Sequence, residues 1–361
     1  MNRRADGAQV AKSNLKTVVV PCGQCGSVEA RFVASGTDRE FATTTDLFTV
    51  VQCTRCGLLY LSPRPDVSEL GTIYPDNYQS YNVRPADGGV DRRSWVTRLR
   101  HQLYSRRFRH PLRHLADLSH IDLLDVGCGD GWQLDLYRLG APDRIRTVGV
   151  EIKSEVCDIA RVKGHEVHCG RFEEVNLPGQ FDLVNLSQVI EHVAEPRAFI
   201  RRIHENLRPG GIFVLETPNT DTLDWKWFRS GAWGAYHIPR HWTFFDPRSL
   251  RRVVESAGFE FLELSFHPAP VHWVWTLHNL SLAKGGVIGR IGERIFAPMD
   301  VFGGGVKAFA LLSVFTAIDT ALRAVTGRTS SMMAIFRKGS VAQPGETESP
   351  QGRLAGPTAV A

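Results

Sequence analysis

The chain lacks a strong excess of charge of either sign. Its 361 residues contain 43 Lys and Arg against 38 Asp and Glu, for a formal net charge of +5 at pH 7. This balance is too mild to indicate nucleic-acid binding without a local basic cluster. Hydrophobic residues make up 43% of the chain, enough for a full globular core and a second small module.

The first residues also lack a long apolar run. Met1–Lys16 is polar and does not contain the uninterrupted hydrophobic core of a signal peptide. We therefore expect residues 1–17 to be disordered and the protein to be cytoplasmic. Cysteine is scarce, with seven residues, and in a reducing compartment we expect thiols or metal ligands in place of disulfides.

Four of the cysteines form two C-x-x-C pairs, Cys22 with Cys25 and Cys53 with Cys56. Two such pairs supply four thiolates for tetrahedral zinc, and the segments between them have strand-like composition. Four protein ligands leave no position for water, so the metal is expected to be structural. The spacing predicts a zinc ribbon over residues 18–61, with four unrelated buried cysteines as the alternative.

Residues 62–119 read as a connecting segment. Tyr74, Tyr78 and Tyr81 could close over a substrate or could simply pack on the surface. Between Arg92 and His114 the chain has eight arginines, three histidines and no acid, in a helix-like pattern. This basic face fits phosphates, a lipid head group or RNA, and a solvated helix face is the simpler interpretation.

From residue 120 onward, strand-like and helix-like segments alternate, which predicts an α/β fold with a parallel sheet and helices on both faces. The expected segments are Ile121–Val126, Gly131–Arg138, Ile145–Glu151, Ser154–Lys163, Glu166–His168, Phe181–Ser187, Pro196–Leu207 and Ile212–Thr217, followed by strands at Phe259–Phe266 and Ser331–Arg337. The domain is predicted to cover residues 120–338. Residues 339–361, rich in Pro, Gly, Ser and Glu, are expected to be disordered.

A glycine-rich turn follows the first strand of this domain, with the sequence Asp125-Val-Gly-Cys-Gly-Asp-Gly131. Glycines there let a ligand approach the backbone closely. The G-x-G-x-x-G spacing of pyrophosphate-binding turns is missing. Glu151, at the end of the next strand, can accept hydrogen bonds from both ribose hydroxyls of a nucleoside. The acid that opens the turn suits a ligand carrying an ammonium group.

With this turn, the chain resembles the class I S-adenosylmethionine-dependent methyltransferases. Further matching motifs are Val148-Gly-Val-Glu151, Phe181-Asp-Leu-Val184, Gln188-Val-Ile-Glu-His-Val193 and Leu207-Arg-Pro-Gly-Gly211. The resemblance implies a seven-stranded Rossmann-like sheet and S-adenosylmethionine as cofactor. It implies the following binding residues: Asp125, Gly127, Cys128 and Gly129 around the methionine portion, Glu151 on the ribose, Ile152 and Phe172 beside adenine, and Ser187 and Gln188 along the methionine end.

A long aromatic loop, Asn219–Trp242, lies where acceptors bind in that family. His192, His237 and His241 are the candidate bases, and we favour His237 or His241, with Tyr236 as a polar support. His192 equally suits a role in orienting its loop, because a Glu-His pair recurs in relatives with different acceptors. In-line attack on the sulfonium methyl depends mostly on positioning, and the base removes a proton.

Residues 268–328 form a large insertion between the last two strands, expected to be a helical lid. Its apolar stretch Ala308–Ile318 is too short to span a bilayer. The alternative is a peripheral membrane contact through residues 287–326, at the inner membrane face, with Arg290, Arg294 and Lys307 near head groups.

The two C-x-x-C pairs, Leu61-Ser-Pro-Arg-Pro65 and Ile73-Tyr-Pro-Asp-Asn-Tyr78 also resemble a subgroup that contains sugar C-methyltransferases. The chain is similar as well to the ubiquinone-biosynthesis-type O-methyltransferases. The predicted function is therefore methyl transfer to a small-molecule acceptor such as a nucleotide-linked sugar or glycan precursor. The first alternative is O-methylation of a phenolic or lipid-linked intermediate. An RNA-binding protein or a catalytically silent cofactor-binding protein is the alternative from another class, although no RNA-binding strand motif is visible. The sequence predicts no oligomeric state.

Overall fold

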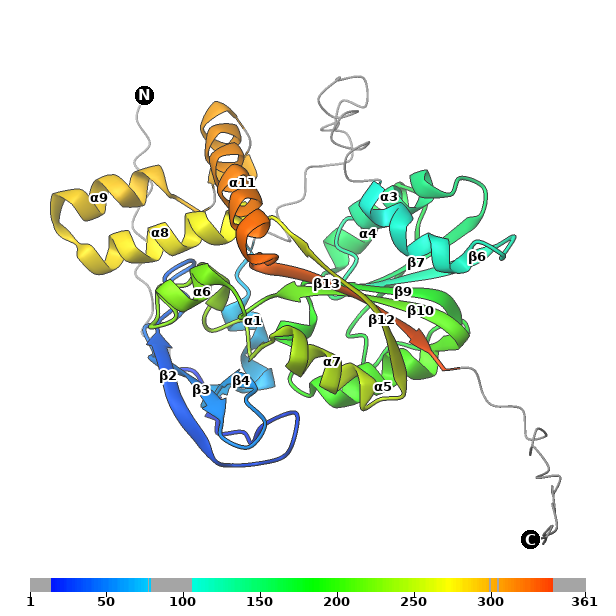
Figure 1. Ribbon diagram of the computed structural model, residues 1–361, viewed down its shortest axis with the longest axis horizontal. Coiled ribbons are helices and arrows are strands. Elements are labelled where there is room, and N and C mark those ends of the chain that lie inside the picture. Colours follow the sequence, from blue (N-terminus) through cyan, green and yellow to red (C-terminus); the bar gives the residue numbers. More distant parts are fainter. Residues whose placement is uncertain (1–13, 77, 79–105, 299, 304, 340–361) are drawn as a thin grey trace, which may run out of the picture.

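The computed structural model describes residues 14–76, 78, 106–298, 300–303 and 305–339, and a seven-stranded sheet forms its centre (Figure 1). The strands lie in the order β12-β13-β10-β9-β6-β7-β8. Strands β10, β9, β6, β7 and β8 run parallel, whereas β13 is antiparallel to both β10 and β12. The bounds are Ile121–Val126 (β6), Ile145–Glu151 (β7), Glu166–Cys169 (β8), Phe181–Ser187 (β9), Leu207–Pro218 (β10), Phe259–His267 (β12) and Ser331–Lys338 (β13). The expected Rossmann-like seven-stranded fold is confirmed.

Helices cover both faces of this sheet (Figure 1). Helices α5 (Pro196–Asn206) and α7 (Pro247–Glu255) pack their apolar sides against one face. Helices α3 (Trp132–Gly140) and α4 (Ser154–Val162) cover the other. The central strands are buried on both sides, as their near-continuous apolar sequences require. Because β6, β7 and β9 are parallel, the turns that follow these strands all lie at the same end of the sheet, where the carboxyl ends of the strands meet.

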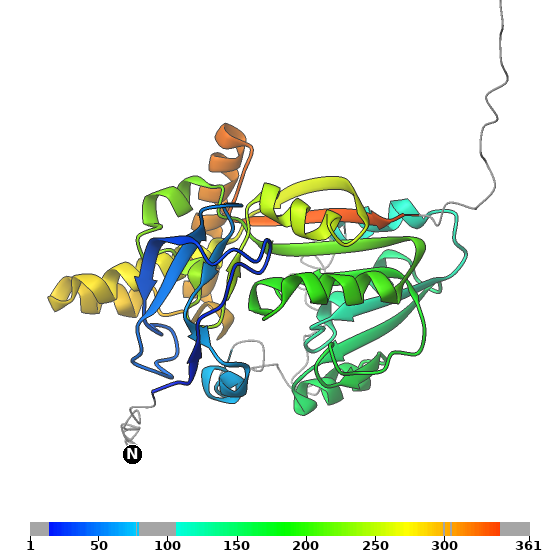
Figure 2. The same cartoon turned by 90° about the horizontal axis from the view of Figure 1, so that it is seen from below.

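The N-terminal module shares its sheet with a strand from the domain that follows it. Strands β2 (Ala30–Gly36), β3 (Phe48–Cys53) and β4 (Leu59–Leu61) form an antiparallel sheet, and β11 (Thr243–Phe244) adds to its edge beside β4. A second pair joins β1 (Thr17–Val18) to β5 (Arg64–Pro65). Figure 2 shows the N-terminal strands beside the main sheet. The module predicted for residues 18–61 is thus packed onto the domain that follows it.

The insertion between β12 and β13 consists of helices α8 (Pro270–Lys284), α9 (Gly286–Ile295), α10 (Asp300–Gly303) and α11 (Val306–Thr326). The apolar stretch expected at Ala308–Ile318 is part of the 21-residue helix α11. By length and composition, α11 is the one helix among the described residues that could cross a membrane. The length argument against spanning, made for eleven residues, is therefore wrong for the helix as it forms.

The cysteine expectation is corrected at one pair. Cys157 on α4 and Cys169 at the end of β8 form a disulfide, with their Cα atoms 6.2 Å apart. Helix α4 runs back over the sheet to reach β8, which brings the two positions within the Cα range of a disulfide. Sequence spacing carries no information about that return path.

Some expectations lie outside the described residues. They are the start of the chain at residues 1–13, Tyr81, most of the basic segment 92–114, and the tail 340–361. Within the described part of the basic segment, residues 106–112 are helical. Short helical turns at Val67–Glu69 and α1 (Leu70–Ile73) precede this gap.

Candidate active site

The turn after β6 has the geometry of a ligand cradle. Gly127, Gly129 and Gly131 all have positive φ, at 76°, 54° and 79°, a region that side chains other than glycine rarely adopt. A Cβ atom on Gly129 would meet nothing within 4 Å. The backbone there is exposed to an approaching ligand, and α3 begins directly after the turn.

Glu151, at the end of β7, is held against this turn. Its Oε2 accepts a hydrogen bond from the amide of Gly129 (3.1 Å), and its Oε1 accepts from the amides of Ile152 (2.8 Å) and Lys153 (3.1 Å). These bonds fix the carboxylate where a ribose bound over the turn would meet it. Ile152 exposes an apolar side chain beside it.

Asp125 is buried at the end of β6 and belongs to a polar network that the sequence did not reveal. Its Oδ1 accepts from Nδ2 of Asn185 (2.7 Å), whose Oδ1 accepts from the hydroxyl of Tyr137 (3.0 Å). Burial raises the pKa of Asp125 to about 7, an effect that the nearby Glu151 adds to and the Asn185 hydrogen bond opposes. The carboxyl is thus poised to ionise when a cation binds close to it.

The remaining predicted cofactor residues lie at the end of β9, under the glycine turn or in the core. Ser187 donates to Glu216 (3.0 Å), and the amide of Gln188 donates to the Glu216 carbonyl (2.8 Å), so both lie at the end of β9. Cys128 is buried under the turn, where Gly149 leaves room for its sulfur. Phe172 is buried against Phe199 of α5, which places it in the core.

The three candidate histidines converge into one cluster, in which His237 and His241 are buried and His192 is half-buried. The ring centroids of His192 and His241 are 4.5 Å apart, and those of His237 and His241 are 4.9 Å apart. Burial and mutual repulsion lower the pKa of His192 to about 3 and that of His241 well below its usual value. Both imidazoles are therefore neutral at physiological pH.

Hydrogen bonds orient the rings of His241 and His192. Nδ1 of His241 lies 2.8 Å from the Ala235 carbonyl, and because a carbonyl oxygen only accepts, this Nδ1 donates and Nε2 keeps a lone pair. Nδ1 of His192 lies 3.2 Å from the Arg240 carbonyl and 2.7 Å from the Tyr74 hydroxyl. In the tautomer that donates from Nδ1 to these two oxygens, Nε2 of His192 carries a lone pair.

His237 meets the N-terminal module. Its Nδ1 contacts Oε2 of Glu40, and its ring stacks on Trp275 of α8 at 5.0 Å. Burial raises the pKa of Glu40 well above its usual value, which favours a protonated carboxyl that can donate to the imidazole. Asp38 accepts two hydrogen bonds from Arg240 (3.1 and 2.8 Å), and both side chains are fully buried.

Tyr236 does not support these histidines. Its hydroxyl donates to the carbonyl of Arg229 (2.7 Å), and its ring packs against Trp233 and Phe244. The hydroxyl that reaches a histidine belongs to Tyr74, from the segment after the N-terminal module. The expected support therefore comes from a different element.

Direct contacts join the histidine cluster to the glycine turn. A Cβ on Gly127 would lie 2.6 Å from Cγ2 of Val189, so the backbone of the turn packs tightly on the residue before the helical turn Ile190–His192. The Trp242 amide donates to the Glu191 carbonyl (2.6 Å). The aromatic loop, the helical turn and the glycine turn thus form one continuous site.

Several known proteins are similar in sequence to this chain. A family model described as a methyltransferase domain matches residues 99–264. A ubiquinone biosynthesis O-methyltransferase from Azorhizobium caulinodans is 32% identical over 187 residues, which cover 46% of this chain and 71% of that protein. The chain belongs to the class I S-adenosylmethionine-dependent methyltransferases.

Other relatives of this methyltransferase carry the same name. The one from Cereibacter sphaeroides is 30% identical over 190 residues, covering 48% of this chain and 74% of that protein. The one from a Bradyrhizobium species is 34% identical over 142 residues, covering 37% of this chain and about half of that protein's length, 53%. A solved methyltransferase from Archaeoglobus fulgidus is 20% identical, with 66% of this chain and 94% of that chain covered and a TM-score of 0.41.

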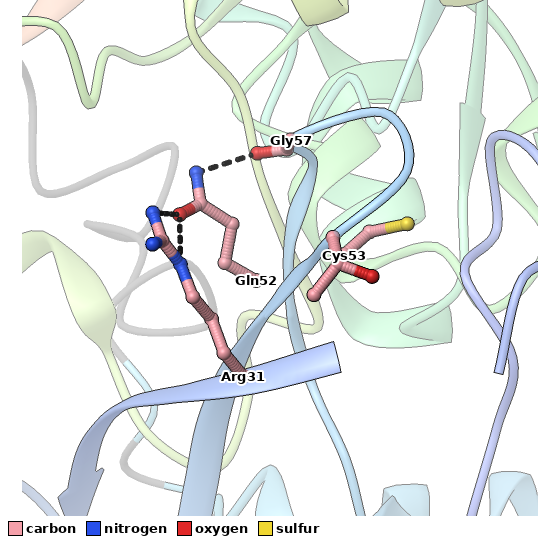
Figure 3. A pocket seen from close by; sticks show the side chains of 5 residues that line it. Arg31, Gln52, Cys53 and Gly57 are labelled. Atoms are coloured by element: carbon pink, nitrogen blue, oxygen red, sulfur yellow. Dashed lines mark hydrogen bonds between the residues drawn. The ribbon is translucent and has the colours of Figure 1, made fainter. Parts of the chain in front are cut away.

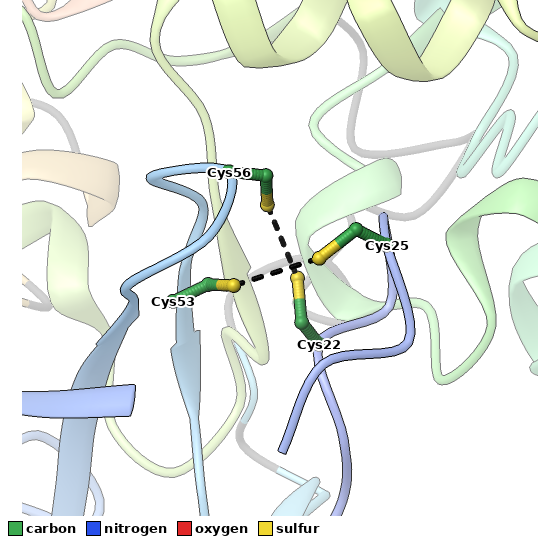
Figure 4. Close-up of side chains that lie close together, drawn as sticks. All are labelled: Cys22, Cys25, Cys53 and Cys56. Carbon is green, nitrogen blue, oxygen red and sulfur yellow. Dashed lines mark hydrogen bonds between the residues drawn. The ribbon is translucent and has the colours of Figure 1, made fainter. Parts of the chain in front are cut away.

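The methyltransferase also gathers its four N-terminal cysteines (Figure 4). The sulfurs of Cys22 and Cys56 are 3.4 Å apart, those of Cys25 and Cys53 are 3.6 Å apart, and all four lie within 4.8 Å of one another. Tetrahedral zinc with Zn–S bonds of about 2.3 Å separates its sulfur ligands by roughly 3.8 Å. The donor set and its spacing fit a zinc ribbon.

A second group of candidate ligands lies in the histidine cluster. Single ligand atoms of Glu191, His192 and His241 lie within 4.8 Å of one another. One Glu191 oxygen accepts from Thr217 (2.9 Å), and burial raises the pKa of this carboxyl to about 8. To act together as metal ligands, these residues would need Glu191 in its ionised form.

A surface pocket on the N-terminal module is separate from this site (Figure 3). Its polar groups satisfy one another: Arg31 donates to Gln52 (2.6 and 3.0 Å), and Gln52 donates to the Gly57 carbonyl (3.0 Å). The lining residues are Arg31, Gln52, Cys53, Thr54 and Gly57. Nothing in this arrangement points to a ligand.

Proposed function

We propose that this methyltransferase methylates an acidic hydroxyl, such as a phenol or an enol, on a small molecule, and that His192 accepts the hydroxyl proton. The neutral histidine pair carries the proposal: with Nδ1 donating to a backbone carbonyl, Nε2 of His192 and of His241 each hold a lone pair. Val189, just before the helical turn that carries His192, packs on Gly127 of the glycine turn. Such a nitrogen can accept the proton that leaves as oxygen attacks the methyl group.

The cofactor supplies an electrophilic methyl group on a sulfonium. In our proposal Glu151 accepts hydrogen bonds from the ribose, and the exposed side chain of Ile152 packs on adenine. The turn leaves open space at Gly129 for the methionine portion. Asp125 lies beneath that portion, where its ionised form attracts the ammonium group.

The names of the relatives bear on the acceptor. They state O-methylation. This observation supports the phenolic or lipid-linked alternative over the sugar.

A nucleotide-linked sugar stays a second candidate because of one observation. The imidazole of His237 contacts the carboxyl of Glu40 and stacks on the indole of Trp275. Polar groups beside an aromatic face are suited to sugar hydroxyls. We further propose a structural zinc at the four cysteines and action in the cytoplasm.

The test follows transfer of labelled methyl groups from S-adenosylmethionine. The protein is offered two acceptors, a phenol with an apolar chain and a nucleotide-linked keto-sugar. We expect label in the phenol, on oxygen, and a loss of at least about a hundredfold in rate for His192→Ala. Label on a sugar carbon, or wild-type rates in His192→Ala, would reject the proposal. His237→Ala and His241→Ala, measured in parallel, test the other two candidates.

A further inference from the structure

Helix α11 turns an apolar surface away from the protein. Its buried side faces α8, where Phe315 stacks on Trp273 at 6.1 Å. On other sides of the helix, Phe309 is 73% exposed and Val314 55% exposed. Only 17% of its most apolar window is buried. In Figures 1 and 2 this helix and the α8–α9 pair extend beyond the central sheet.

The outer surface of α11 lacks charge almost completely. Between Lys307 and Arg323 the one charged residue is Asp319, and it is buried. Its carboxylate accepts from the Ala269 amide (2.6 Å) and from Nε1 of Trp273 (2.7 Å). A helix that faces water normally carries charged residues on its outer side. An apolar helix of this length is otherwise found in a core or in lipid.

Helix α9 also exposes an apolar face. Gly289 and Gly292 pack so closely on α8 that a Cβ on Gly289 would lie 2.7 Å from the Ser281 carbonyl oxygen. The side chains of α9 must therefore lie elsewhere, and Ile288, Ile291 and Ile295 are exposed. Positions 288, 291 and 295 share one helix face by their spacing.

We propose that α9 and α11 dock this protein onto the surface of an anionic lipid bilayer. The basic residues of this region favour an anionic bilayer over a neutral one. Lys284, Arg290 and Arg294 lie exposed on or next to α9, and Lys307 is the second residue of α11. Of the two acids in this stretch, Asp300 is paired with Lys307 at 2.6 Å, and Glu293 on α9 is half-buried. Basic residues beside an exposed apolar face are the arrangement that binds anionic membrane surfaces.

The chain topology indicates that α11 lies on the membrane surface and does not cross the bilayer. The insertion leaves β12 at His267 and returns to β13 at Ser331, and these two residues are partners in the antiparallel pair. A single crossing by α11 would separate two strands that are hydrogen-bonded to each other. The two Asp319 bonds also tie the middle of α11 to α8. The helix therefore lies in the interface plane.

The experiment is flotation of the full chain with vesicles. Neutral vesicles contain phosphatidylcholine alone, and anionic vesicles contain phosphatidylcholine with phosphatidylglycerol. We expect binding to the anionic vesicles. Ile291→Ser with Val314→Ser should weaken it at least about tenfold. Arg290→Gln with Arg294→Gln should weaken it about fivefold per residue. Because all four side chains are exposed, the variants should fold.

Matched controls lie elsewhere on the molecule. Val162→Ser replaces an exposed apolar residue at the end of α4, and Arg248→Gln an exposed basic residue on α7. Both should bind vesicles as wild type does. A wild-type chain that stays unbound with anionic vesicles overturns the proposal. A dimer that Ile291→Ser with Val314→Ser converts to monomer, without vesicle binding, also overturns it by assigning the face to a second copy. Neither outcome bears on methyl transfer, which is measured separately.

Discussion

The hydroxyl of Tyr74 lies 2.7 Å from Nδ1 of His192, so a residue from the segment after the N-terminal module orients a histidine that follows strand β9. The ring of His192 is also in contact with His241 from the aromatic loop. Three segments far apart in the sequence thus determine how one imidazole is placed and which nitrogen is free.

Tyr74→Phe should slow methyl transfer about fivefold to tenfold, which corresponds to the loss of one hydrogen bond of about 1 kcal/mol. Cofactor affinity should not change, because the hydrogen bond that is removed is made to the histidine. The measurement compares kcat with the Kd for S-adenosylmethionine. Tyr236→Phe is the matched control: its hydroxyl bonds the Arg229 carbonyl, so it should lose stability and keep its rate. Equal rates in wild type and Tyr74→Phe would remove Tyr74 from the mechanism.

The parallel strands were predictable because their sequences alternate with amphipathic helices and end at recognisable motifs. The glycine turn and Glu151 were found in this way, since the strands that carry them are local in sequence. Their contact, from the Gly129 amide to Glu151, follows from the adjacency of β6 and β7.

The partners of the histidines could not be predicted in the same way. Asp38 and Glu40 lie in an N-terminal loop with no motif, and β11 joins the sheet of that module only through pairing across the fold. Long-range pairing leaves no trace in local periodicity. The one available signal was the polar-aromatic composition of Tyr74 and Tyr78, which was equally compatible with surface packing.

The affinity for S-adenosylmethionine should rise with pH between about pH 6 and 7.5. Burial raises the pKa of Asp125 to about 7, so the carboxyl is mostly protonated at pH 6 and ionises as pH rises through this value. The ionised form attracts the cationic cofactor, which gives an increase of up to about tenfold. Calorimetric titration measures it. Asp125→Asn cannot ionise and should show weaker binding with a flat profile; an equal pH slope in this variant would contradict the assignment.

The buried pair of Asp38 and Arg240 should anchor the N-terminal module. Both side chains are fully buried, so Arg240→Met leaves an unpaired charge and should cost about 3–5 kcal/mol in the free energy of unfolding. Lys226→Met removes an exposed partner of Asp221 at 3.7 Å and should cost at most about 1 kcal/mol. Urea unfolding of both variants provides the comparison. A loss below 1 kcal/mol in Arg240→Met would show that the pair does not hold the module.

The purified protein should contain about one zinc ion per chain, bound by Cys22, Cys25, Cys53 and Cys56. The turns that present these thiols depend on Gly26 and Gly57, each with positive φ and each donating its amide to the carbonyl of the first cysteine of its pair. Metal analysis should find the ion in wild type and little of it in Cys22→Ser. Cys128→Ala removes a buried thiol outside the cluster and should retain the zinc. Because β11 extends the sheet of this module and precedes α7, loss of zinc should lower both the melting temperature and the rate of methyl transfer. A wild-type protein that is fully folded and free of metal would rule out the structural role.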